Sequence, residues 1–311
     1  MAARLLNPAL PVVLFARAAA ALGLARPALN LIVNRGILPR SGRAFARYRS
    51  DPRDVIVACF PKSGTNWAMQ LCLQIAHRGA AEFAHIHELV PWPEGPMAEP
   101  VTLEDPAPRR GAPTGYRVIK THLEDRYLPQ GPAPRRLTIV RDPKEVVVSS
   151  YFFMLGLLGV LHRVTPARWV EMCLQREHMV TRWAEHTAGF WAARDQPNTL
   201  VRTFDQLKAD LPAAVDDVAG FMGVALTPEE RAAVLARCSF AYMREHRSRF
   251  SAPPFPLAKP DQFPALIRRG AQGRSDELLS AAQQRQIDAL ARERLQALGC
   301  DFPYDERFAV A

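Results

Sequence analysis

Residues 61–67 (Pro-Lys-Ser-Gly-Thr-Asn-Trp) have the composition of an anion-binding turn. They join a short apolar run to a stretch of helical periodicity, and they contain one glycine, Gly64. At a helix N-terminus the backbone N–H groups and the helix dipole favour a bound anion, and a glycine lets the backbone close around it. Lys62 and the hydroxyls of Ser63 and Thr65 can complete a phosphate cradle. The lysine precedes the glycine, so the Walker A order GxxxxGK[ST] is absent.

Lys120 and His122 lie at the end of a second apolar run and have side chains suited to group transfer. A positioned imidazole can remove the proton of a hydroxyl while that oxygen forms a new bond. The ammonium groups of Lys62 and Lys120 can stabilise negative charge that develops on the transferred group. A lone histidine after a strand is more often a packing residue, so residue type alone does not assign this role.

A second group of cations could bind a phosphate at some distance from the first. Arginine suits forked recognition of phosphate, and three arginines are candidates, namely Arg141, Arg268 and Arg269. Flat aromatic side chains could stack on a base, although each taken alone is more often a core residue. The candidates for stacking are Trp67, Phe204 and Phe240.

Several motifs, in chain order, resemble those of the cytosolic-type sulfotransferases, over roughly residues 54–300. Residues 61–67 resemble the loop of that family that binds the 5′-phosphosulfate, and residues 120–123 (KTHL) resemble its strand end with the catalytic histidine. Further resemblances are those of residues 141–149 (RDPKEVVVS) to the 3′-phosphate motif, of 204–208 (FDQLK), of Ser239-Phe240 with Met243, and of 268–273 (RRGAQG) to the loop that closes over the nucleotide. Several collinear motifs make coincidence improbable.

The resemblance implies an enzyme that moves a sulfuryl group from 3′-phosphoadenosine 5′-phosphosulfate (PAPS) to an acceptor hydroxyl and releases adenosine 3′,5′-bisphosphate (PAP). Direct in-line transfer is expected by analogy with phosphoryl transfer. His122 is the expected general base, with Lys62 and Lys120 as the other catalytic residues. The expected donor-binding residues are Lys62, Ser63, Gly64, Thr65, Asn66, Trp67, Arg141, Ser149, Phe204, Phe240, Arg268, Arg269 and Gly270.

No metal site is expected. The family needs no metal, and two histidines two residues apart, His85 and His87, are usually incidental even beside Glu88. The five cysteines are scattered without a CxxC pair, which argues against both a zinc site and a disulfide framework. Reduced thiols in a cytoplasmic protein are therefore the expectation.

The acceptor is expected to be a hydrophobic alcohol or phenol. Residues 87–92 (HELVPW) resemble the acceptor-side loop of the family, and residues 151–158 (YFFMLGLL) are unusually apolar. Both segments could line an apolar pocket, and ordinary core packing explains them equally well. The identity of the alcohol does not follow from the sequence.

Short apolar runs alternate with helical stretches after residue 50. Strands are predicted at residues 55–60, 116–121, 136–140 and 198–203, and helices from residue 66 onwards, over 165–193, over 228–238 and over 280–298. This alternation predicts an α/β fold: a single P-loop-like domain with a central, mostly parallel sheet flanked by helices. There is no internal repeat or low-complexity linker that would divide it.

Residues 1–50 are expected to form a basic, apolar arm that precedes a domain over residues 51–311. The arm holds eight arginines and no Asp or Glu. Since the whole chain has 40 basic and 31 acidic residues, the other 261 residues carry 32 basic and 31 acidic side chains. The net charge of +9 therefore describes the arm, and it does not indicate nucleic-acid binding.

The apolar run of the arm, residues 11–25, is interrupted by Arg17 and is too short to span a bilayer. One interpretation is an amphipathic segment in peripheral contact with an anionic membrane. The other, which is favoured, is a helix that packs on the core with its arginines facing water. A cytoplasmic location, with or without membrane association, is compatible with both.

Two other functions remain open from the residues alone. A P-loop kinase is disfavoured by the missing Walker A order. A non-catalytic nucleotide-binding or membrane-binding protein of the same fold is disfavoured because Lys62, Lys120, His122 and Ser149 are all present. Selective binding of a 3′,5′-bisphosphate over ATP would separate a sulfotransferase from a kinase.

Overall fold

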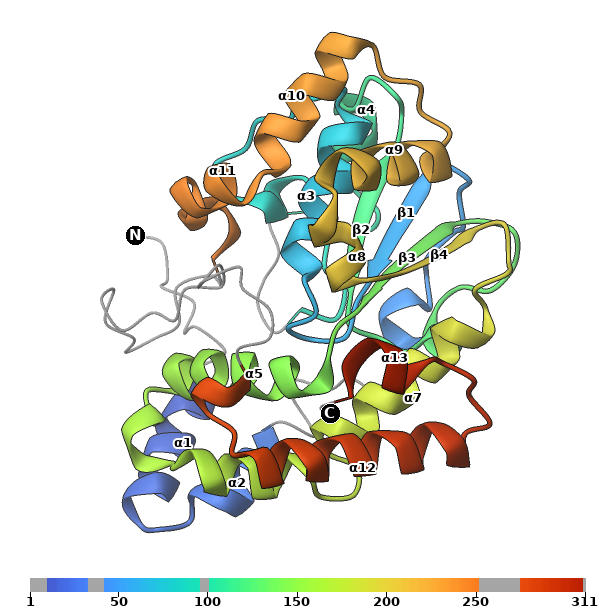
Figure 1. Ribbon diagram of the computed structural model, residues 1–311. Helices are drawn as coiled ribbons and strands as arrows, with labels where there is room; N and C mark the ends of the chain where they lie inside the picture. Colours follow the sequence, from blue (N-terminus) through green and yellow to red (C-terminus); the bar gives the residue numbers. More distant parts are fainter. Residues whose placement is uncertain (1–9, 33–41, 96–100, 252–274, 310–311) are drawn as a thin grey trace, which may run out of the picture.

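A sheet of four parallel strands lies at the centre of the computed structural model, which describes residues 10–32, 42–95, 101–251 and 275–309 (Figure 1). The strand order is β2-β1-β3-β4. The strands are β1 (Asp54–Ala58), β2 (Arg117–Thr121), β3 (Arg135–Val140) and β4 (Thr199–Thr203). The predicted α/β fold with a parallel sheet is confirmed, and each predicted strand begins within one residue of the observed one.

Both faces of the sheet are covered by helices, as expected for buried parallel strands. Side chains alternate along a strand, so Val55 and Val57 join one hydrophobic core while Ile56 and Ala58 join the other. The first core includes residues of α3 (Thr65–Ala76), α9 (Leu211–Met222) and α10 (Pro228–Cys238). The second includes residues of α5 (Pro143–Leu158), α7 (Met179–Ala192) and α12 (Ala281–Ala297).

The helical region predicted over residues 165–193 is two helices. Thr165 caps α6 (Pro166–Cys173) by accepting a hydrogen bond from the backbone N–H of Arg168. The chain leaves the helical conformation after Leu174, and Glu177 adopts a φ of 61°. A non-glycine residue in this left-handed conformation cannot continue a right-handed helix, and α7 starts only at Met179.

The remaining α-helices of the described residues are short or lie near the ends of the chain. They are α1 (Leu10–Ala21), α2 (Ala25–Ile32), α4 (Ala107–Gly111), α8 (Phe204–Ala209), α11 (Phe240–Glu245) and α13 (Tyr304–Phe308). The helices predicted over residues 228–238 and 280–298 are observed as α10 and α12. Pro228 is the first residue of α10, and Ser280 forms a capping box before α12.

Helices α1 and α2 pack against the same side of the sheet as α5. Val13, Ala16 and Leu29 belong to the core cluster that contains α5 and α7. The Nε of Arg17 donates a hydrogen bond to the carbonyl oxygen of Leu158, the last residue of α5, at 3.2 Å. Within the described ranges, none of the helices has both the length and the apolar character needed to cross a membrane. The described part of residues 1–50 therefore contributes to the core.

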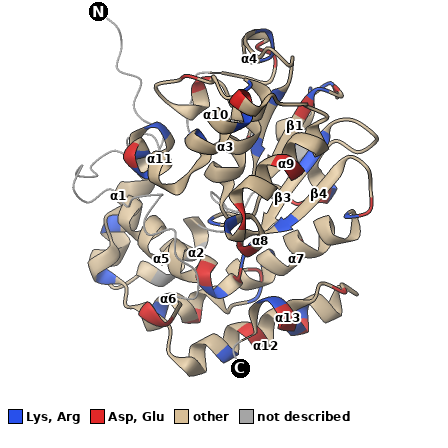
Figure 2. Ribbon diagram, turned by 45° about the horizontal axis from the view of Figure 1, so that its top comes forward, with Lys and Arg blue, Asp and Glu red and all other residues tan. Residues whose placement is uncertain are grey.

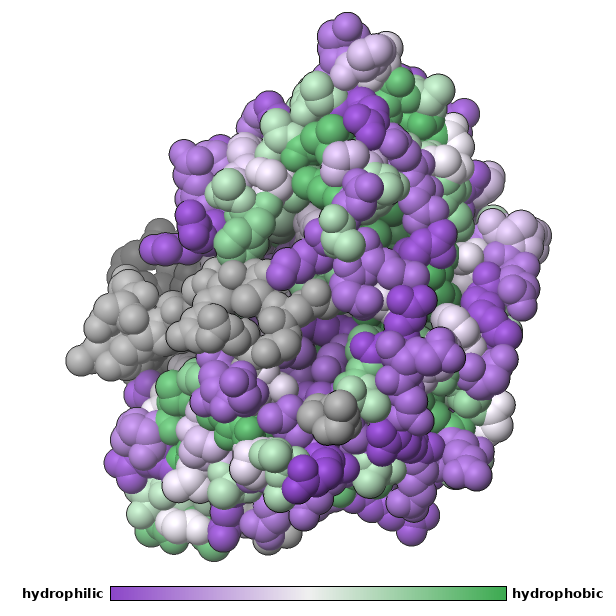
Figure 3. Space-filling view, in the orientation of Figure 1, coloured by the Kyte–Doolittle hydropathy of each residue, from purple (hydrophilic) through white to green (hydrophobic). Residues whose placement is uncertain are grey.

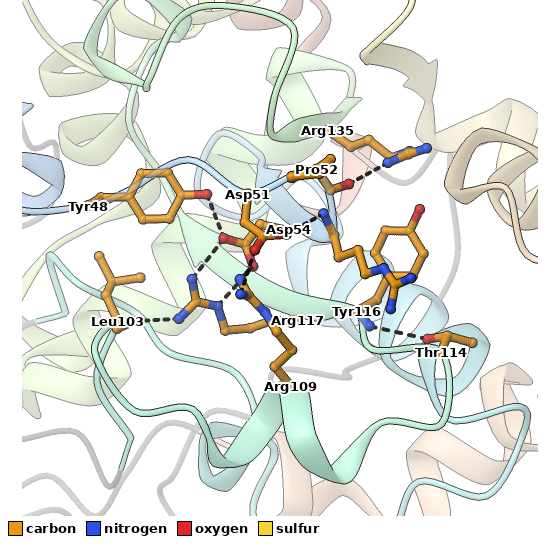
Figure 4. A network of polar contacts seen from close by, with 11 residues as sticks. Tyr48, Asp51, Pro52, Asp54, Leu103, Arg109, Thr114, Tyr116, Arg117 and Arg135 are labelled. Atoms are coloured by element: carbon orange, nitrogen blue, oxygen red, sulfur yellow. Dashed lines mark hydrogen bonds and ion pairs between the residues drawn. The ribbon is translucent and has the colours of Figure 1, made fainter.

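A buried carboxylate holds the amino ends of β1 and β2 together (Figure 4). Asp54 is fully buried, and its Oδ2 accepts hydrogen bonds from Tyr48 at 2.7 Å and from Arg117 at 2.8 Å. Its Oδ1 pairs with Arg109 at 2.7 Å. Two guanidinium groups thus compensate the buried charge, which would otherwise be costly. The network attaches Tyr48, near the end of residues 1–50, and Arg109 of α4 to the edge of the sheet opposite the carboxyl ends of the strands.

A second buried ion pair attaches the C-terminal helices to the start of α5. Lys144 Nζ lies 2.5 Å from Asp288 of α12 and donates to the carbonyl oxygen of Phe308 at 2.6 Å. The hydroxyl of Tyr304 also donates to Asp288, at 2.7 Å. The outer surfaces of α12 and α13 carry charges of both signs, as solvated helices do (Figure 2).

Candidate active site

The loops that follow β1 and β3 meet at the carboxyl edge of the sheet. The chain runs from β1 to β2 on one side and then crosses to β3 on the other side of β1. Such a reversal of strand order is where ligands bind in open α/β sheets. Arg141, directly after β3, donates from Nη1 to the backbone oxygen of Lys62, in the loop after β1, at 3.0 Å. The two predicted phosphate-binding motifs are therefore in contact.

The loop between β1 and α3 has the backbone conformation of a tight turn. Lys62 and Gly64 both have positive φ values, 69° and 98°. A Cβ at residue 64 would lie 2.8 Å from Cδ2 of Phe204, so a glycine is needed for this close approach as well as for the turn. The buried hydroxyl of Ser63 has no hydrogen-bond partner among the described residues. Such a hydroxyl fits a ligand oxygen at this turn.

Aromatic rings hold the two lysine ammonium groups. Lys62 Nζ lies 3.9 Å from the ring centroid of Phe153 on α5. Lys120 Nζ lies 3.4 Å from the ring centroid of Trp92, and the Lys120 side chain is buried. A cation at this distance from a ring face is attracted by its quadrupole. Both positive charges are thus placed near the carboxyl ends of β1 and β2.

One ring nitrogen of His122 is hydrogen-bonded to the backbone. Its Nδ1 lies 2.7 Å from the carbonyl oxygen of Cys59. A carbonyl oxygen only accepts, so Nδ1 carries the hydrogen and the neutral ring has its lone pair at Nε2. Burial, and then the neighbouring Lys120 ammonium, lower the pKa of His122 to about 3. The ring is therefore neutral at pH 7 and able to accept a proton.

Glu94 holds the turn that carries His122, and it was not among the site residues predicted from the sequence. Its Oε1 accepts hydrogen bonds from the Thr121 hydroxyl at 2.8 Å and from the backbone N–H of His122 at 2.6 Å. Burial raises the pKa of this carboxyl. Trp92 packs edge-on against His122 with ring centroids 5.4 Å apart. The only sequence signal was the position of Glu94 just after the HELVPW segment.

Two aromatic rings, those of Trp67 and Phe204, form a wall beside the turn between β1 and α3. Trp67 and Phe204 pack edge to face with ring centroids 5.6 Å apart, and the Arg141 guanidinium lies 4.8 Å from the Phe204 ring centroid. Trp67 Nε1 donates to the carbonyl oxygen of Cys238 at 3.0 Å, and Asn66 Nδ2 donates to that of Phe250 at 2.8 Å. The side chain of Asn66 thus contacts the end of a short 3-10 helix, Arg247–Phe250.

Two other predicted donor-binding residues lie on helices α5 and α11, and three lie outside the described residues. Phe240 is 42% exposed at the start of α11, and its ring is contacted by the Arg244 guanidinium at 5.7 Å. Ser149 is half-buried on α5. Arg268, Arg269 and Gly270 lie outside the described residues.

The two histidines that were considered for a metal site, His85 and His87, are bonded to backbone carbonyl groups. His85 Nε2 lies 2.9 Å from the oxygen of Ser251, and His87 Nδ1 lies 2.8 Å from that of Val90. Burial and the Lys120 ammonium lower the pKa of His87 to about 3, and the ring stacks on Trp92. Within the ranges that the structure describes, no group of three or more His, Cys, Asp or Glu side chains could hold a metal ion.

Comparison with known proteins identifies relatives over most of the chain. A family model described as sulfotransferase domain matches residues 52–299. Sulfotransferase 2A1 of Macaca fascicularis is 28% identical over 260 residues, which cover 81% of this chain and 88% of the relative. The 3-alpha-hydroxysteroid sulfotransferase of Cavia porcellus is 27% identical over 246 residues, which cover 78% of this chain and 83% of that protein.

Solved structures show the same fold. Retinol dehydratase in complex with androsterone and inactive cofactor PAP superposes with a TM-score of 0.66 at 19% identity, covering 89% of this chain and 88% of that one. Mouse sulfotransferase SULT7A1 complexed with PAP gives a TM-score of 0.57 at 20% identity, covering 83% of this chain and 92% of that one.

Proposed function

Because this chain belongs to the sulfotransferase domain family, we propose that it transfers a sulfuryl group from PAPS to a hydrophobic alcohol or phenol, with His122 as general base. The main support for this proposal is the hydrogen bonding and packing of the neutral His122 ring at the carboxyl edge of the sheet. Its Nδ1 is committed to Cys59, and Trp92, against which it packs, also holds the Lys120 ammonium. Its Nε2 is left as the proton acceptor.

In the proposed reaction the acceptor oxygen bonds to sulfur as the bond between sulfur and the phosphate oxygen breaks, and PAP leaves. The hydroxyl proton passes to Nε2 of His122. PAPS supplies the activated sulfuryl group when bound. The lysines that lower the pKa of His122 in the free chain would be partly neutralised by the charge of a bound donor. The imidazole would then become a stronger base only when the donor is present.

The two lysines would stabilise charge as it develops. Lys62 and Lys120 are held over Phe153 and Trp92, so little reorganisation is needed when negative charge grows on the transferred group and on the bridging oxygen. Fixed cations in a site with little water act more strongly than the same charges in solution. No step of this proposal assigns a role to a metal.

Donor binding is proposed for the turn and the aromatic wall around it. The 5′ end would lie against the turn, where the Ser63 hydroxyl has no hydrogen-bond partner among the residues that the structure describes and Gly64 has no side chain. Arg141 and Ser149 would bind the 3′-phosphate, and Trp67 and Phe204 would flank the adenine. Phe240, Arg268, Arg269 and Gly270 complete the proposed set by resemblance to the family.

The acceptor is proposed to be lipophilic. Phe153 lies beside Lys62, and a half-buried Phe152 precedes it on α5, so apolar surface adjoins the transferring group. One relative is named a hydroxysteroid sulfotransferase, and one structural neighbour holds androsterone. A domain over residues 51–311 in a cytoplasmic protein is part of the same proposal.

Replacing His122 by alanine tests the assignment of the base. We expect His122→Ala to lower kcat by about 10²–10⁴-fold, the usual contribution of a positioned general base. PAP affinity, measured by calorimetry, should stay within a few fold of the wild type, which shows that the fold and the donor site are intact. Turnover near the wild-type value would mean that another group removes the proton.

A further inference from the structure

The helical hairpin α1–α2 exposes an unusual amount of apolar surface. Of eight exposed large hydrophobic side chains among the described residues, six lie between residues 10 and 32. They are Val12 (39% exposed), Leu14 (49%), Phe15 (47%), Leu22 (75%), Leu24 (54%) and Leu31 (50%). In Figure 3 the lower left of the molecule, where Figure 1 places α1 and α2, shows green, hydrophobic surface beside pale and purple residues.

Helix α1 is apolar on both of its sides. Val13, Ala16 and Ala19 are buried against the protein, while Leu14 and Phe15 point to solvent. A surface helix of a water-soluble protein normally presents polar residues on its outer face, as α12 does with its charges of both signs. The outer face of α1 therefore has the composition of a surface that another apolar phase covers.

The positive charge of residues 1–50 indicates which kind of partner would cover the exposed apolar side chains. Residues 1–50 contain eight arginines and no acidic residue, whereas the rest of the chain is nearly neutral. Arg43, Arg47 and Arg49 are exposed shortly after α2. Exposed leucine and phenylalanine, with arginine and no acidic residue in the same segment, match helices that lie in the boundary between lipid headgroups and acyl chains. A second copy of this basic segment would add like charge instead.

We propose that α1 and α2 dock on an anionic phospholipid bilayer, with the six exposed apolar side chains inserted at the interface and the exposed Arg43, Arg47 and Arg49 near the headgroups. The helices lie on the membrane and do not span it. The helix α5 links this surface to the candidate site, since Arg17 of α1 contacts its last residue and Phe153 in its middle lies beside Lys62. If the proposed function holds, an alcohol dissolved in the bilayer would enter beside the active site.

Flotation of the full chain with vesicles tests this docking without any substrate. Vesicles of phosphatidylglycerol and phosphatidylcholine in equal parts should carry most of the protein at low salt. Vesicles of phosphatidylcholine alone should carry much less, and high salt should reduce binding to the anionic vesicles because it screens the arginines. The double variant Phe15→Glu/Leu22→Glu should lose binding by at least about tenfold, since it places two charges in the apolar phase.

Leu298→Glu is the matched control, because Leu298 is 41% exposed at the end of α12, outside the α1–α2 hairpin. It should float like the wild type. Equal flotation of the double variant and the wild type would overturn the proposal. The proposal would also be overturned if the wild type did not bind vesicles and light scattering showed a dimer that the double variant does not form. A second copy of the chain would then cover the exposed apolar side chains of α1 and α2.

A third result would also overturn the docking proposal: the wild type does not bind vesicles, and the double variant melts several degrees lower than the wild type. Such a loss of stability would mean that Phe15 and Leu22 are covered by another part of the same chain. Turnover of a water-soluble phenol by the double variant should match the wild type. This assay separates failure of the docking surface from failure of the proposed function.

Discussion

Gly64 shows how the sequence of the turn between β1 and α3 determines its geometry. Its φ of 98° strains any other residue, and a Cβ there would be 2.8 Å from the Phe204 ring. We expect Gly64→Ala to displace Phe204 and to weaken PAP binding by roughly tenfold or more, the size of a typical overpacking cost of about 1–3 kcal/mol. Calorimetric titration with PAP measures the effect.

Gly131→Ala is the control for backbone strain. Gly131 has a φ of 113°, but a Cβ there would meet nothing within 4 Å. Both variants should lose about 1–3 kcal/mol of stability from the strained backbone, and only Gly64→Ala should also lose PAP affinity. Equal PAP affinity in the two variants would show that the contact with Phe204 is not needed for the donor site.

Among the elements, the segment after residue 90 acts as a support for the end of β2. The backbone N–H of Lys120 donates to the carbonyl oxygen of Pro91 at 2.9 Å, and Trp92 contacts both Lys120 and His122. Glu94 then accepts two hydrogen bonds from the turn at Thr121 and His122. We infer that Glu94 is a positioning residue that fixes where the imidazole lies.

Two substitutions of Glu94 separate positioning from charge. Glu94→Gln retains an oxygen that can accept both hydrogen bonds and should keep kcat within about tenfold, whereas Glu94→Leu should lower kcat by roughly 10²-fold through misplacement of His122. KM for the donor should change little in both. Steady-state kinetics decide: equal losses in the two variants would point to the negative charge, and no loss in Glu94→Leu would remove the role.

On the scale of the whole molecule, several histidines are buried in the neutral form. His178 is 1% exposed, and neither ring nitrogen has a hydrogen-bond partner among the described residues. Burial lowers the pKa of His178 to about 4, compared with an ordinary value of 6.5. Above pH 6.5 the ring is neutral in both folded and unfolded chains. As the pH falls from 6.5 towards 4, only the unfolded chain takes up the proton, so stability is lost.

The variant His178→Leu should therefore reduce the loss of stability on acidification. At up to about 1.4 kcal/mol per pH unit, the free energy of unfolding of the wild type should fall by about 2 kcal/mol more than that of the variant between pH 7.5 and pH 5. Urea denaturation at the two pH values gives this difference, with His162→Leu on the surface as the control. Parallel losses would mean that His178 is protonated within the folded chain.

The sequence predicted the four strands because each is a short apolar run that ends in polar residues at the carboxyl edge of the sheet. It also predicted the turn, since its chemistry lies in consecutive residues. It did not predict the break at Glu177, which depends on one backbone conformation inside an otherwise helical pattern. Glu94 was missed because its partners are 27 and 28 residues away. The pairing of Lys144 with Asp288 likewise joins positions 144 residues apart.

The most direct test of the central claim is calorimetric binding of PAP, compared with AMP and ATP, to the wild type, to Arg141→Ala and to Arg231→Ala as a surface control. Arg141 joins the loops after β1 and β3. We predict that PAP binds much more tightly than either other nucleotide. Arg141→Ala should weaken PAP binding by roughly 10–100-fold, as expected for hydrogen bonds to a charged group, while Arg231→Ala has no effect. Equal affinity for PAP and ATP, or unchanged PAP affinity in Arg141→Ala, would contradict the account.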